Sequence, residues 1–590
     1  MAKKSADYYL DTILSLKQVQ TMSLGAEIEK HAIDQPDHPA LIYGEKIITY
    51  DQLNRMANRY ASFFIQQGFQ KGDVVALLME NRPEYLAAVI GMSKLGIISS
   101  LINRSVRGEV LADGINMSYA RAVIVGYELL DLFETIADLI RLMSPARILV
   151  EAGEEKHTLP DGFDDLNESL NSLSDSNPET TAQITTEDVL VYLSSTGNTG
   201  WRKATPITQA RFLKMGNQYV MLTHFDNDTV QYMCLPFYFN SAFNVCFSSM
   251  VISGSAMVIK RDFSVHAFWD DIRKYQANYF VSVGEMARYI YSMPEKPDDA
   301  DNSLENMICN GIWGNLIAPF RQRFGIKHLI EHYGNTEGVG TYINHKEVIK
   351  MCGNLSLLGM RQGQVIRCDP VSDEIVHDES GWAIKCSPGE VGLLIGEINE
   401  INKYMGYIND PEASESRLLR NVFREGDVYF NSGDLVHVHE NEDISFVDRM
   451  GDTYRWKSQT VSSSQVADVI SKFFGGIEDC TVYGVRVPGT EGRCGMAAIK
   501  LVEDEKLDWK KLIAHINKRM PPHARPLFVR IIEELDTSDD LKLLKKHLQE
   551  ESFDIVKVKD PLYFLDPQQD QYVPLTSEIF QALQEQKLRL

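Results

Sequence analysis

A buried strand that runs straight into a loop rich in glycine and hydroxyl residues is the feature that most constrains this chain. The strand is Val189–Leu193, and the loop over residues 194–203 reads Ser-Ser-Thr-Gly-Asn-Thr-Gly-Trp-Arg-Lys. Glycines let a backbone approach a ligand, and N–H groups, hydroxyls and a lysine can together surround phosphate oxygens. A P-loop would need Gly-Lys before Ser or Thr, whereas Lys203 follows Arg202. The loop is therefore a candidate triphosphate clamp of another kind, with a Ser/Gly-rich surface turn as the alternative when it is taken alone.

Strands and helices alternate on the N-terminal side of this loop. Val74–Met79 and Val123–Val125 read as strands, and residues 38–60 read as a short strand pair followed by a helix with Asp51 as candidate N-cap. This rhythm is typical of a parallel sheet with crossover helices.

The chain changes character in its last third. Short strands separated by turns fill residues 387–447, and a mixed α and β pattern follows residues 448–452. We predict an α/β protein with a large N-terminal domain, 1–449, of doubly wound βαβ subdomains plus a small β-barrel-like unit. A small mobile α+β domain, 450–590, is expected to follow it.

Charge and composition exclude several classes of protein. The 590 residues carry a formal net charge of −23, which disfavours a nucleic-acid partner. The eight cysteines are scattered without a C-x-x-C pair, so neither a zinc site nor a disulfide framework is suggested. The N-terminal residues 1–20 read as an amphipathic helix, and the apolar stretch 87–101 contains Lys94 and is shorter than the roughly 20 residues that a spanning helix requires. We expect a soluble, cytoplasmic protein that can touch a membrane surface peripherally.

Several motifs, in order along the chain, resemble the ANL superfamily of adenylate-forming enzymes. Its signature loop reads Thr-Ser-Gly-Thr-Thr-Gly-x-Pro-Lys, and the loop here keeps that spacing, with Asn198 at one Thr and Arg202 at the Pro. The resemblance implies that ATP phosphates are held by Ser195, Thr196, Gly197, Asn198, Thr199, Gly200 and Lys203.

A second element, residues 333–338, resembles the family's Tyr-Gly-x-Thr-Glu. There the resemblance implies that Tyr333 packs on adenine, Thr336 contacts the α-phosphate and Glu337 helps to hold Mg²⁺, with Gly334 and Asn335 between them. A hard cation that bridges phosphates prefers carboxylate oxygen, which suits Glu337. Thr196 is the other predicted metal ligand. Asn310 and Gly311 resemble the adenine-side Gly-Asn-Gly-x-Arg, with Trp313 in the last place.

Further motifs imply the ribose site and the second half-reaction. Ser432-Gly433-Asp434 resembles the element whose Asp binds the ribose hydroxyls, and Arg449 of Asp448-Arg449 is expected beside it. Taken singly, Asp434 or Glu337 could be a solvated surface carboxylate. Lys457, in Trp456-Lys457-Ser458, matches the CoA-channel element, where the family has Gly in place of Ser458. The segment 450–452 matches the hinge about which the family's small domain rotates.

Lys542 is the main catalytic candidate. It matches the family lysine that bridges the carboxylate and the α-phosphate, with Ser538, Asp539 and Asp540 in place of Thr-Gly-Thr. The alternative for Lys542 is a solvated helix face shared with Lys545 and Lys546.

The stretches 261–289 and 446–457 are similar to the fatty-acid-transport-protein branch, which contains very-long-chain acyl-CoA synthetases. The resemblance implies an acid–thiol ligase that uses ATP, Mg²⁺ and CoA on a long- or very-long-chain fatty acid, with a second copy of the chain as a further candidate partner. Phe239 stands where the branch has His, which predicts a reshaped acyl pocket. Two alternatives remain, an acyl-AMP ligase with a non-CoA acceptor and a non-catalytic fatty-acid-binding or transport-associated homologue.

Overall fold

The computed structural model describes residues 22–153, 159, 162–195, 203–312, 316–357, 360–369, 374–399, 402–450, 453–457, 459–473, 475–490, 492–503, 505–536, 544–567 and 569–588. Contacts divide the chain into two units. Unit 1 comprises Met1–Gly197, Arg202–Gly353 and Lys403–Ser416, and unit 2 comprises Asn198–Trp201, Asn354–Asn402 and Arg417–Leu590. The predicted N-terminal helix over residues 1–20 lies outside the described residues.

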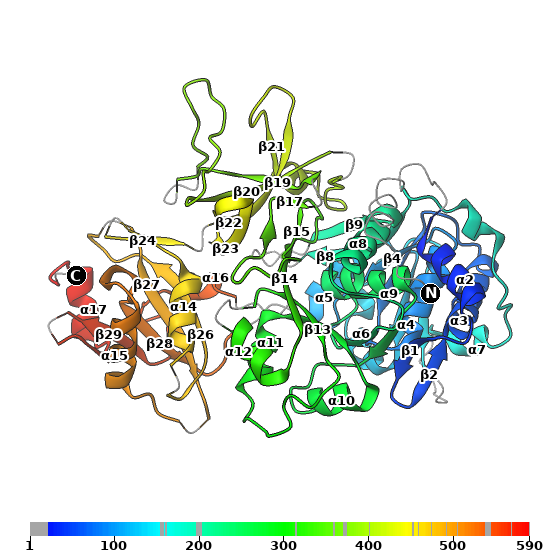
Figure 1. The fold of residues 1–590 in the computed structure, drawn as a ribbon, viewed down its shortest axis with the longest axis horizontal. Coiled ribbons are helices and arrows are strands. Elements are labelled where there is room, and N and C mark those ends of the chain that lie inside the picture. The colour runs from blue at the N-terminus through cyan, green and yellow to red at the C-terminus, as the bar shows by residue number, and fades with distance from the viewer. Residues whose placement is uncertain are drawn as a thin grey trace. The chain divides into compact units, whose positions relative to one another are not determined.

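The first sheet of unit 1 is parallel except at its last strand pair (Figure 1). In spatial order its strands are β7 (Asp164–Asp165), β6 (Arg147–Glu151), β5 (Ala122–Gly126), β3 (Val74–Leu78), β4 (Ile98–Leu101), β8 (Val189–Ser195) and β9 (Lys203–Thr208). Val74, Ala76 and Leu78 pack into a core with helix α5 (Gly108–Asn116), and Val75 and Leu77 between them are buried too. A parallel strand covered on both faces reads as an unbroken apolar run, which is why the sequence predicted β3 and β5 correctly.

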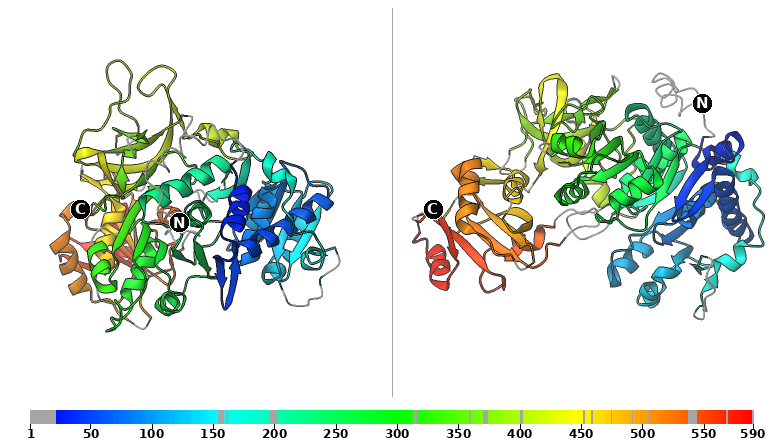
Figure 2. Two further views of the ribbon diagram at one scale, coloured as in Figure 1. Left: turned by 45° about the vertical axis from the view of Figure 1, so that its right-hand side comes forward. Right: turned by 60° about the horizontal axis from the view of Figure 1, so that its bottom comes forward.

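Helices lie on both sides of the sheet, and those that follow β3 in the chain connect its strands. The helices are α2 (Leu24–Asp34), α3 (Tyr50–Gln66), α4 (Pro83–Ser93), α5, α6 (Leu130–Glu134) and α7 (Leu166–Leu170). Figure 2 shows the blue and cyan helices flanking the strands of this part. The prediction that Asp51 caps α3 was wrong. Thr49 is the N-cap, because its hydroxyl accepts from the N–H of Gln52 while the Gln52 side chain accepts from the N–H of Thr49. This reciprocal capping box satisfies two helix-end donors, which Asp51 alone would not do.

The second sheet of unit 1 gathers strands from both ends of the unit. Its order is β15 (Thr341–Ile343), β14 (His328–Gly334), β13 (Asn306–Asn310), β12 (Tyr279–Val283), β10 (Val230–Met233), β11 (Ala256–Ile259), β1 (Pro39–Tyr43) and β2 (Lys46–Thr49). Its helices are α8 (Gln209–Leu222), α9 (Ser248–Ser253), α10 (Phe268–Tyr275), α11 (Gly284–Ser292) and α12 (Ile317–Phe324), with α13 (Pro411–Glu415) from the last segment of the unit. A π-helical turn, Ser241–Phe247, precedes α9. Such turns occur often at functional sites.

A fully buried lysine joins several elements of unit 1. The Lys94 ammonium, directly after α4, donates to Asn54 Oδ1 at 2.5 Å and to Asn58 Oδ1 at 2.6 Å. It also lies 3.0 Å from Glu29 Oε1 and 3.4 Å from Asn177 Oδ1. Burial lowers the pKa of Lys94 to about 8, and the Glu29 carboxylate opposes that shift. Among the described residues, no helix combines the length and the apolar character needed to cross a membrane.

The described residues of unit 2 form two larger sheets and two separate strand pairs. The first larger sheet is antiparallel, in the order β23 (Asp443–Arg449), β22 (Val428–Val438), β20 (Val391–Glu397) and β19 (Gly363–Ile366). A further strand, β21 (Leu418–Arg420), pairs with β22. A separate antiparallel pair, β17 (Ser356–Leu357) with β18 (Met360–Arg361), precedes β19 in the chain. The second sheet runs β26 (Ile477–Val485), β27 (Cys494–Leu501), β28 (Phe528–Ile532), β29 (Leu562–Asp566) and β30 (Gln571–Pro574).

The C-terminal part of unit 2 has its own hydrophobic core. It includes Tyr483, Ile499, Leu512 and Phe528, and draws on α14 (Ser463–Ser471), α15 (Trp509–Arg519), α16 (Lys546–Glu551) and α17 (Ser577–Gln584). A β-hairpin, β24 (Tyr454–Trp456) with β25 (Gln459–Val461), contributes Tyr454, Trp456 and Val461 to this core. The predicted α/β class, with mixed sheets and a small α+β part at the C-terminus, is confirmed, whereas the exact domain boundary at residue 449 stays a prediction.

Candidate active site

The predicted adenine-side residues lie where two parallel strands end. Asn310 is the last residue of β13, and Tyr333 and Gly334 end the neighbouring β14. The Asn310 side-chain amide donates to the carbonyl of His332 at 3.4 Å, so the two ends are joined. Gly311 follows with φ +81°, and a Cβ added to it would have no atom within 4 Å. Ligands of open α/β sheets bind outside the carboxyl ends of strands, which is where these residues lie.

The candidate phosphate loop is held at both ends by a strand pair. β8 and β9 are antiparallel, and Ser195 is paired with Lys203. The backbone of Ser195 therefore belongs to β8, while Thr196, Gly197, Asn198, Thr199 and Gly200 lie outside the described residues. The Lys203 ammonium lies over the ring of Tyr407, 4.9 Å from its centroid.

Residues 335–338 form a tight loop directly after β14. The Asn335 side-chain oxygen accepts from the N–H of Gly338 at 2.7 Å and from that of Val339 at 3.3 Å. Gly338 adopts φ +76°, a conformation that favours glycine. Glu337, 6% exposed, accepts a hydrogen bond at 2.5 Å from the hydroxyl of Tyr407 through Oε1. The loop thus presents Thr336 and Glu337 from a fixed backbone.

Sequence reasoning missed two neighbouring cations of α8, Arg211 and Lys214, and the first of them contacts this loop. Arg211 donates from Nη2 to the carbonyl of Thr336 at 2.5 Å, and its Nε and Nη1 have no hydrogen-bond partner among the described residues. Burial lowers the pKa of Arg211 to about 10, while Glu337 raises it. Burial and the neighbouring Arg211 lower the pKa of Lys214 to about 8. Positive charge next to a nucleotide motif suits an anionic ligand.

A phosphate ligand and Mg²⁺ both fit the residues present in unit 1. Glu337 supplies a hard carboxylate oxygen, the ligand type that Mg²⁺ prefers. Arg211 supplies buried N–H donors, and Lys203 supplies an ammonium from the neighbouring sheet edge. Thr196, the other predicted metal ligand, lies outside the described residues.

Unit 2 brings together the two predicted ribose residues. Asp434 of β22 is paired with Arg449 of β23, and the Arg449 Nε lies 3.7 Å from Asp434 Oδ1. The hydroxyl of Ser432 accepts from the N–H of Asp434 at 3.0 Å and donates to the carbonyl of Leu394 at 2.6 Å, which fixes the turn before Asp434. The fixed backbone and the opposite charge of Arg449 together restrict the position of the Asp434 carboxylate.

Asp448, next to Arg449, binds the start of a helix. Its buried Oδ2 accepts from the N–H of Ser463 at 2.9 Å and from the hydroxyls of Ser462 and Ser463 at 3.2 and 3.1 Å. The carboxylate therefore satisfies donors at the N-terminus of α14, where negative charge is favourable. Lys457 is exposed at the turn of the β24–β25 hairpin with φ +50°. Lys542, Ser458, Trp313 and the centre of the predicted hinge at residues 451–452 lie outside the described residues.

The segment 235–240, which carries Phe239, is fixed by Asn81. Asn81 donates to the carbonyls of Leu235 at 2.8 Å and Lys260 at 3.2 Å, and accepts from the N–H of Phe237 at 3.0 Å. Asn81 follows β3 of the first sheet, whereas these partners follow β10 and β11 of the second. The carboxyl ends of both sheets are thereby joined.

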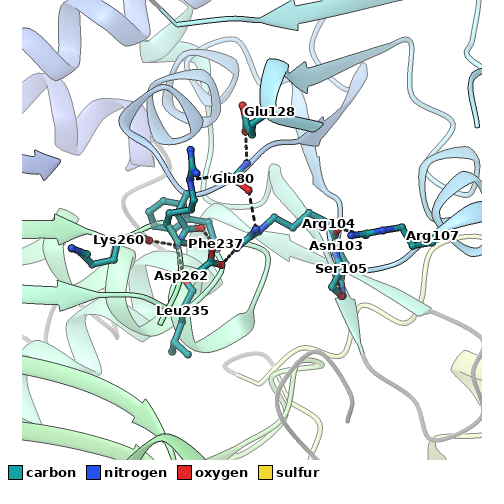
Figure 3. Close-up of polar contacts among 12 residues, drawn as sticks. Glu80, Asn103, Arg104, Ser105, Arg107, Glu128, Leu235, Phe237, Lys260 and Asp262 are labelled. Carbon is teal, nitrogen blue, oxygen red and sulfur yellow. Dashed lines mark hydrogen bonds and ion pairs between the residues drawn. The ribbon is translucent and has the colours of Figure 1, made fainter. Parts of the chain in front are cut away.

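A charged network reinforces the same junction. Figure 3 shows Arg104 reaching from the end of β4 toward Glu80 and Asp262. The Arg104 Nη1 lies 3.3 Å from Glu80 Oε1, and Arg261 Nε lies 2.6 Å from the other oxygen of Glu80. Burial raises the pKa of Glu80, and the two guanidinium groups oppose that shift. The network fixes the backbone at Arg261 and Asp262, shortly after β11.

Two family models match this chain. The model of the AMP-binding enzyme matches residues 28–380, and that of the AMP-binding enzyme C-terminal domain matches residues 474–540. The chain is 34% identical over 565 residues to the long-chain fatty acid transport protein 6 of Mus musculus, covering 95% of this chain and 90% of the relative. It is 32% identical over 560 residues to the medium/long-chain-fatty-acid–CoA ligase FadD6 of Mycobacterium tuberculosis, covering 94% and 90%.

A solved structure shares the fold. The anthranilate CoA ligase AuaEII, crystallised in complex with anthranoyl-AMP, superposes with a TM-score of 0.76 at 17% identity, over 91% of this chain and 98% of that chain. At this identity the likeness concerns the fold.

Proposed function

Since the chain belongs to the AMP-binding enzyme family, in its fatty acid transport protein branch, we propose that it is an ATP-dependent ligase that joins a long- or very-long-chain fatty acid to CoA through an acyl-adenylate. The observation that carries this proposal is the cluster of Lys203, Glu337 and Arg211 around the loop after β14. A fatty-acid-binding protein without catalysis would have no physical need for these charges beside one another.

The proposed reaction has two steps. In the first, a carboxylate oxygen of the fatty acid attacks the α-phosphorus of ATP, the bond to pyrophosphate breaks, and acyl-AMP forms. In the second, the CoA thiolate attacks the acyl carbon and AMP leaves. The first step brings two anions together, so positioning and charge neutralisation are the main requirements.

The residues of unit 1 suit the first step. Lys203 and Arg211 would hold phosphate oxygens, and Thr336 would contact the α-phosphate. Tyr333, with Asn310 and Gly311, would hold the adenine. Mg²⁺, when bound at Glu337, supplies positive charge that offsets the charge of the phosphates.

We assign the remaining roles to residues of unit 2. Asp434, held by Arg449, would accept hydrogen bonds from the ribose hydroxyls. We assign Lys542 to the bridge between carboxylate and α-phosphate, and Lys457 to the CoA side. Rotation of the part after residue 449 would exchange these two lysines between the half-reactions. We place the protein in the cytoplasm. Because an apolar substrate partitions into lipid, we expect the protein to contact a membrane surface peripherally. A homodimer remains a prediction.

Pyrophosphate release tests the proposal. The full chain is incubated with ATP, Mg²⁺ and fatty acids from medium to very long chain length, with and without CoA, and the thioester is followed in parallel. CoA-dependent release with thioester supports the ligase. Acyl-AMP without CoA consumption would instead select an acyl-AMP ligase, the alternative that Ser458 motivates. No release with any acid would select the non-catalytic homologue.

A further inference from the structure

Tyr407 stands between the two charged groups of the nucleotide site in unit 1. Its hydroxyl donates to Glu337 Oε1 at 2.5 Å, although 70 residues separate the two in sequence. The face of its ring lies under the ammonium of Lys203, 4.9 Å from the centroid. Tyr407 is 6% exposed, so its ring and hydroxyl are largely shielded from water, whereas Lys203 is half-buried.

The backbone around Tyr407 is fixed independently of these contacts. The N–H of Ile408 donates to the carbonyl of Ala204 at 2.9 Å, which places Tyr407 directly beside the start of β9. The N–H of Tyr407 donates to the hydroxyl of Ser414 at 2.8 Å, and that hydroxyl donates to the carbonyl of Asp410 at 2.7 Å. The ring and hydroxyl are therefore presented from a rigid turn.

Each contact restricts one charged side chain. A short hydrogen bond from a phenol to a carboxylate is charge-assisted and directional, so it holds Glu337 in one rotamer and leaves Oε2 for a cation. The negative face of the aromatic ring attracts an ammonium group, so it holds Lys203 over the site. One side chain thus fixes the Glu337 carboxylate, a ligand suited to Mg²⁺, relative to the Lys203 ammonium, which is suited to phosphate.

We propose that Tyr407 is a positioning residue that couples Lys203 to Glu337, its hydroxyl orienting the carboxylate for Mg²⁺ and its ring orienting the ammonium for phosphate. This inference rests on the proposed function, because it assigns ATP and Mg²⁺ to the site. It does not depend on which acid is the substrate.

The test separates the hydroxyl from the ring. Tyr407→Phe removes only the hydrogen bond, whereas Tyr407→Ala removes both contacts. Binding of a non-hydrolysable α,β-methylene ATP to the full chain is measured by calorimetry with and without Mg²⁺. We expect Tyr407→Phe to weaken Mg²⁺-supported binding about tenfold, as for the loss of a hydrogen bond to a charged group, and to leave Mg²⁺-free binding unchanged. Tyr407→Ala should weaken binding under both conditions.

A double-mutant cycle and a matched control distinguish a positioning role of Tyr407 from a non-specific disturbance of the surrounding structure. In a Glu337→Gln background, Tyr407→Phe should have little further effect, because the charged acceptor is gone. Tyr404→Phe removes a hydroxyl from the same segment, one that donates to the carbonyl of Ser414 at 3.2 Å, and should bind as the unmodified chain does.

Three results would overturn the inference: unchanged Mg²⁺ dependence in Tyr407→Phe, an equal loss in the Glu337→Gln background, or an equal loss in Tyr404→Phe. Failure of the unmodified chain to bind the nucleotide would instead refute the proposed function.

Discussion

Replacing Gly338 by alanine tests whether the loop after β14 is held in the shape that the site requires. Gly338 has φ +76°, and a Cβ added there would lie 2.2 Å from the Cζ of Arg211. The left-handed conformation costs an L-residue about 1–2 kcal/mol. Moving Arg211 away would also break its charged hydrogen bond to the carbonyl of Thr336, worth about 1.5–3 kcal/mol. If about 3 kcal/mol of this cost is added to the activation free energy of adenylation, the reaction should slow roughly a hundredfold.

The matched control is Gly44→Ala in the turn between β1 and β2. Gly44 has φ +61° and no atom near its added Cβ, so it carries the conformational cost without the steric one. Initial rates of pyrophosphate release and thermal unfolding are compared for both variants and the unmodified chain. We expect a small loss of stability in Gly44→Ala, a larger one in Gly338→Ala, and a loss of rate in Gly338→Ala alone. A normal kcat/KM in Gly338→Ala, or an equal loss of rate in Gly44→Ala, would refute the reasoning.

Three further predictions concern other parts of the chain. Lys542→Ala should abolish adenylation and spare ATP binding, which pyrophosphate release and calorimetry check; retained adenylation would remove Lys542 from the mechanism. Burial raises the pKa of Glu331 to about 8, so the contribution of this neutral carboxyl to stability is fully present below about pH 4.3 and is lost as the pH rises through 8. Thermal unfolding at pH 6 and pH 9 should therefore show a fall for the unmodified chain that Glu331→Gln lacks, and parallel falls would contradict this. Arg530 lies 2.6 Å from both Glu551 and Asp560, whose side chains are 36% and 28% exposed, so Arg530→Ala should cost about 1–2 kcal/mol. Calorimetry of the full chain should show this as a lower transition temperature for unit 2, and an unchanged transition would argue against it.

The fold was predictable where local pattern and burial agree. The unbroken apolar run of β3 could be read directly, because a strand covered on both faces needs no polar alternation. The cap of α3 was misread by two positions, since Thr49 and Asp51 are both good N-caps and only the reciprocal Gln52 contact decides between them. The strand order of the second sheet, in which β1 pairs with β11, could not be read, because it depends on contacts between distant segments.

The candidate site was predictable where a motif is contiguous. Residues 333–337 carry their pattern in one stretch, and Asp434 and Arg449 fall in two short ones. Arg211 and Tyr407 could not be predicted from local sequence, because their role depends on contacts with residues 336 and 337 that form only in the folded chain. A tyrosine in a polar segment reads as an ordinary surface residue until its partner is known.

The buried Lys94 ammonium restricts which substitutions this part of the protein can accept during evolution. A single substitution of Lys94 by an apolar residue would leave Asn54, Asn58 and Glu29 buried or half-buried without their shared donor, at a cost on the order of several kcal/mol. An apolar core here would therefore require several replacements together, and each intermediate would be less stable than either end point. The lysine and its acceptors should vary as a set, so sequences that lack one of them should lack the others as well.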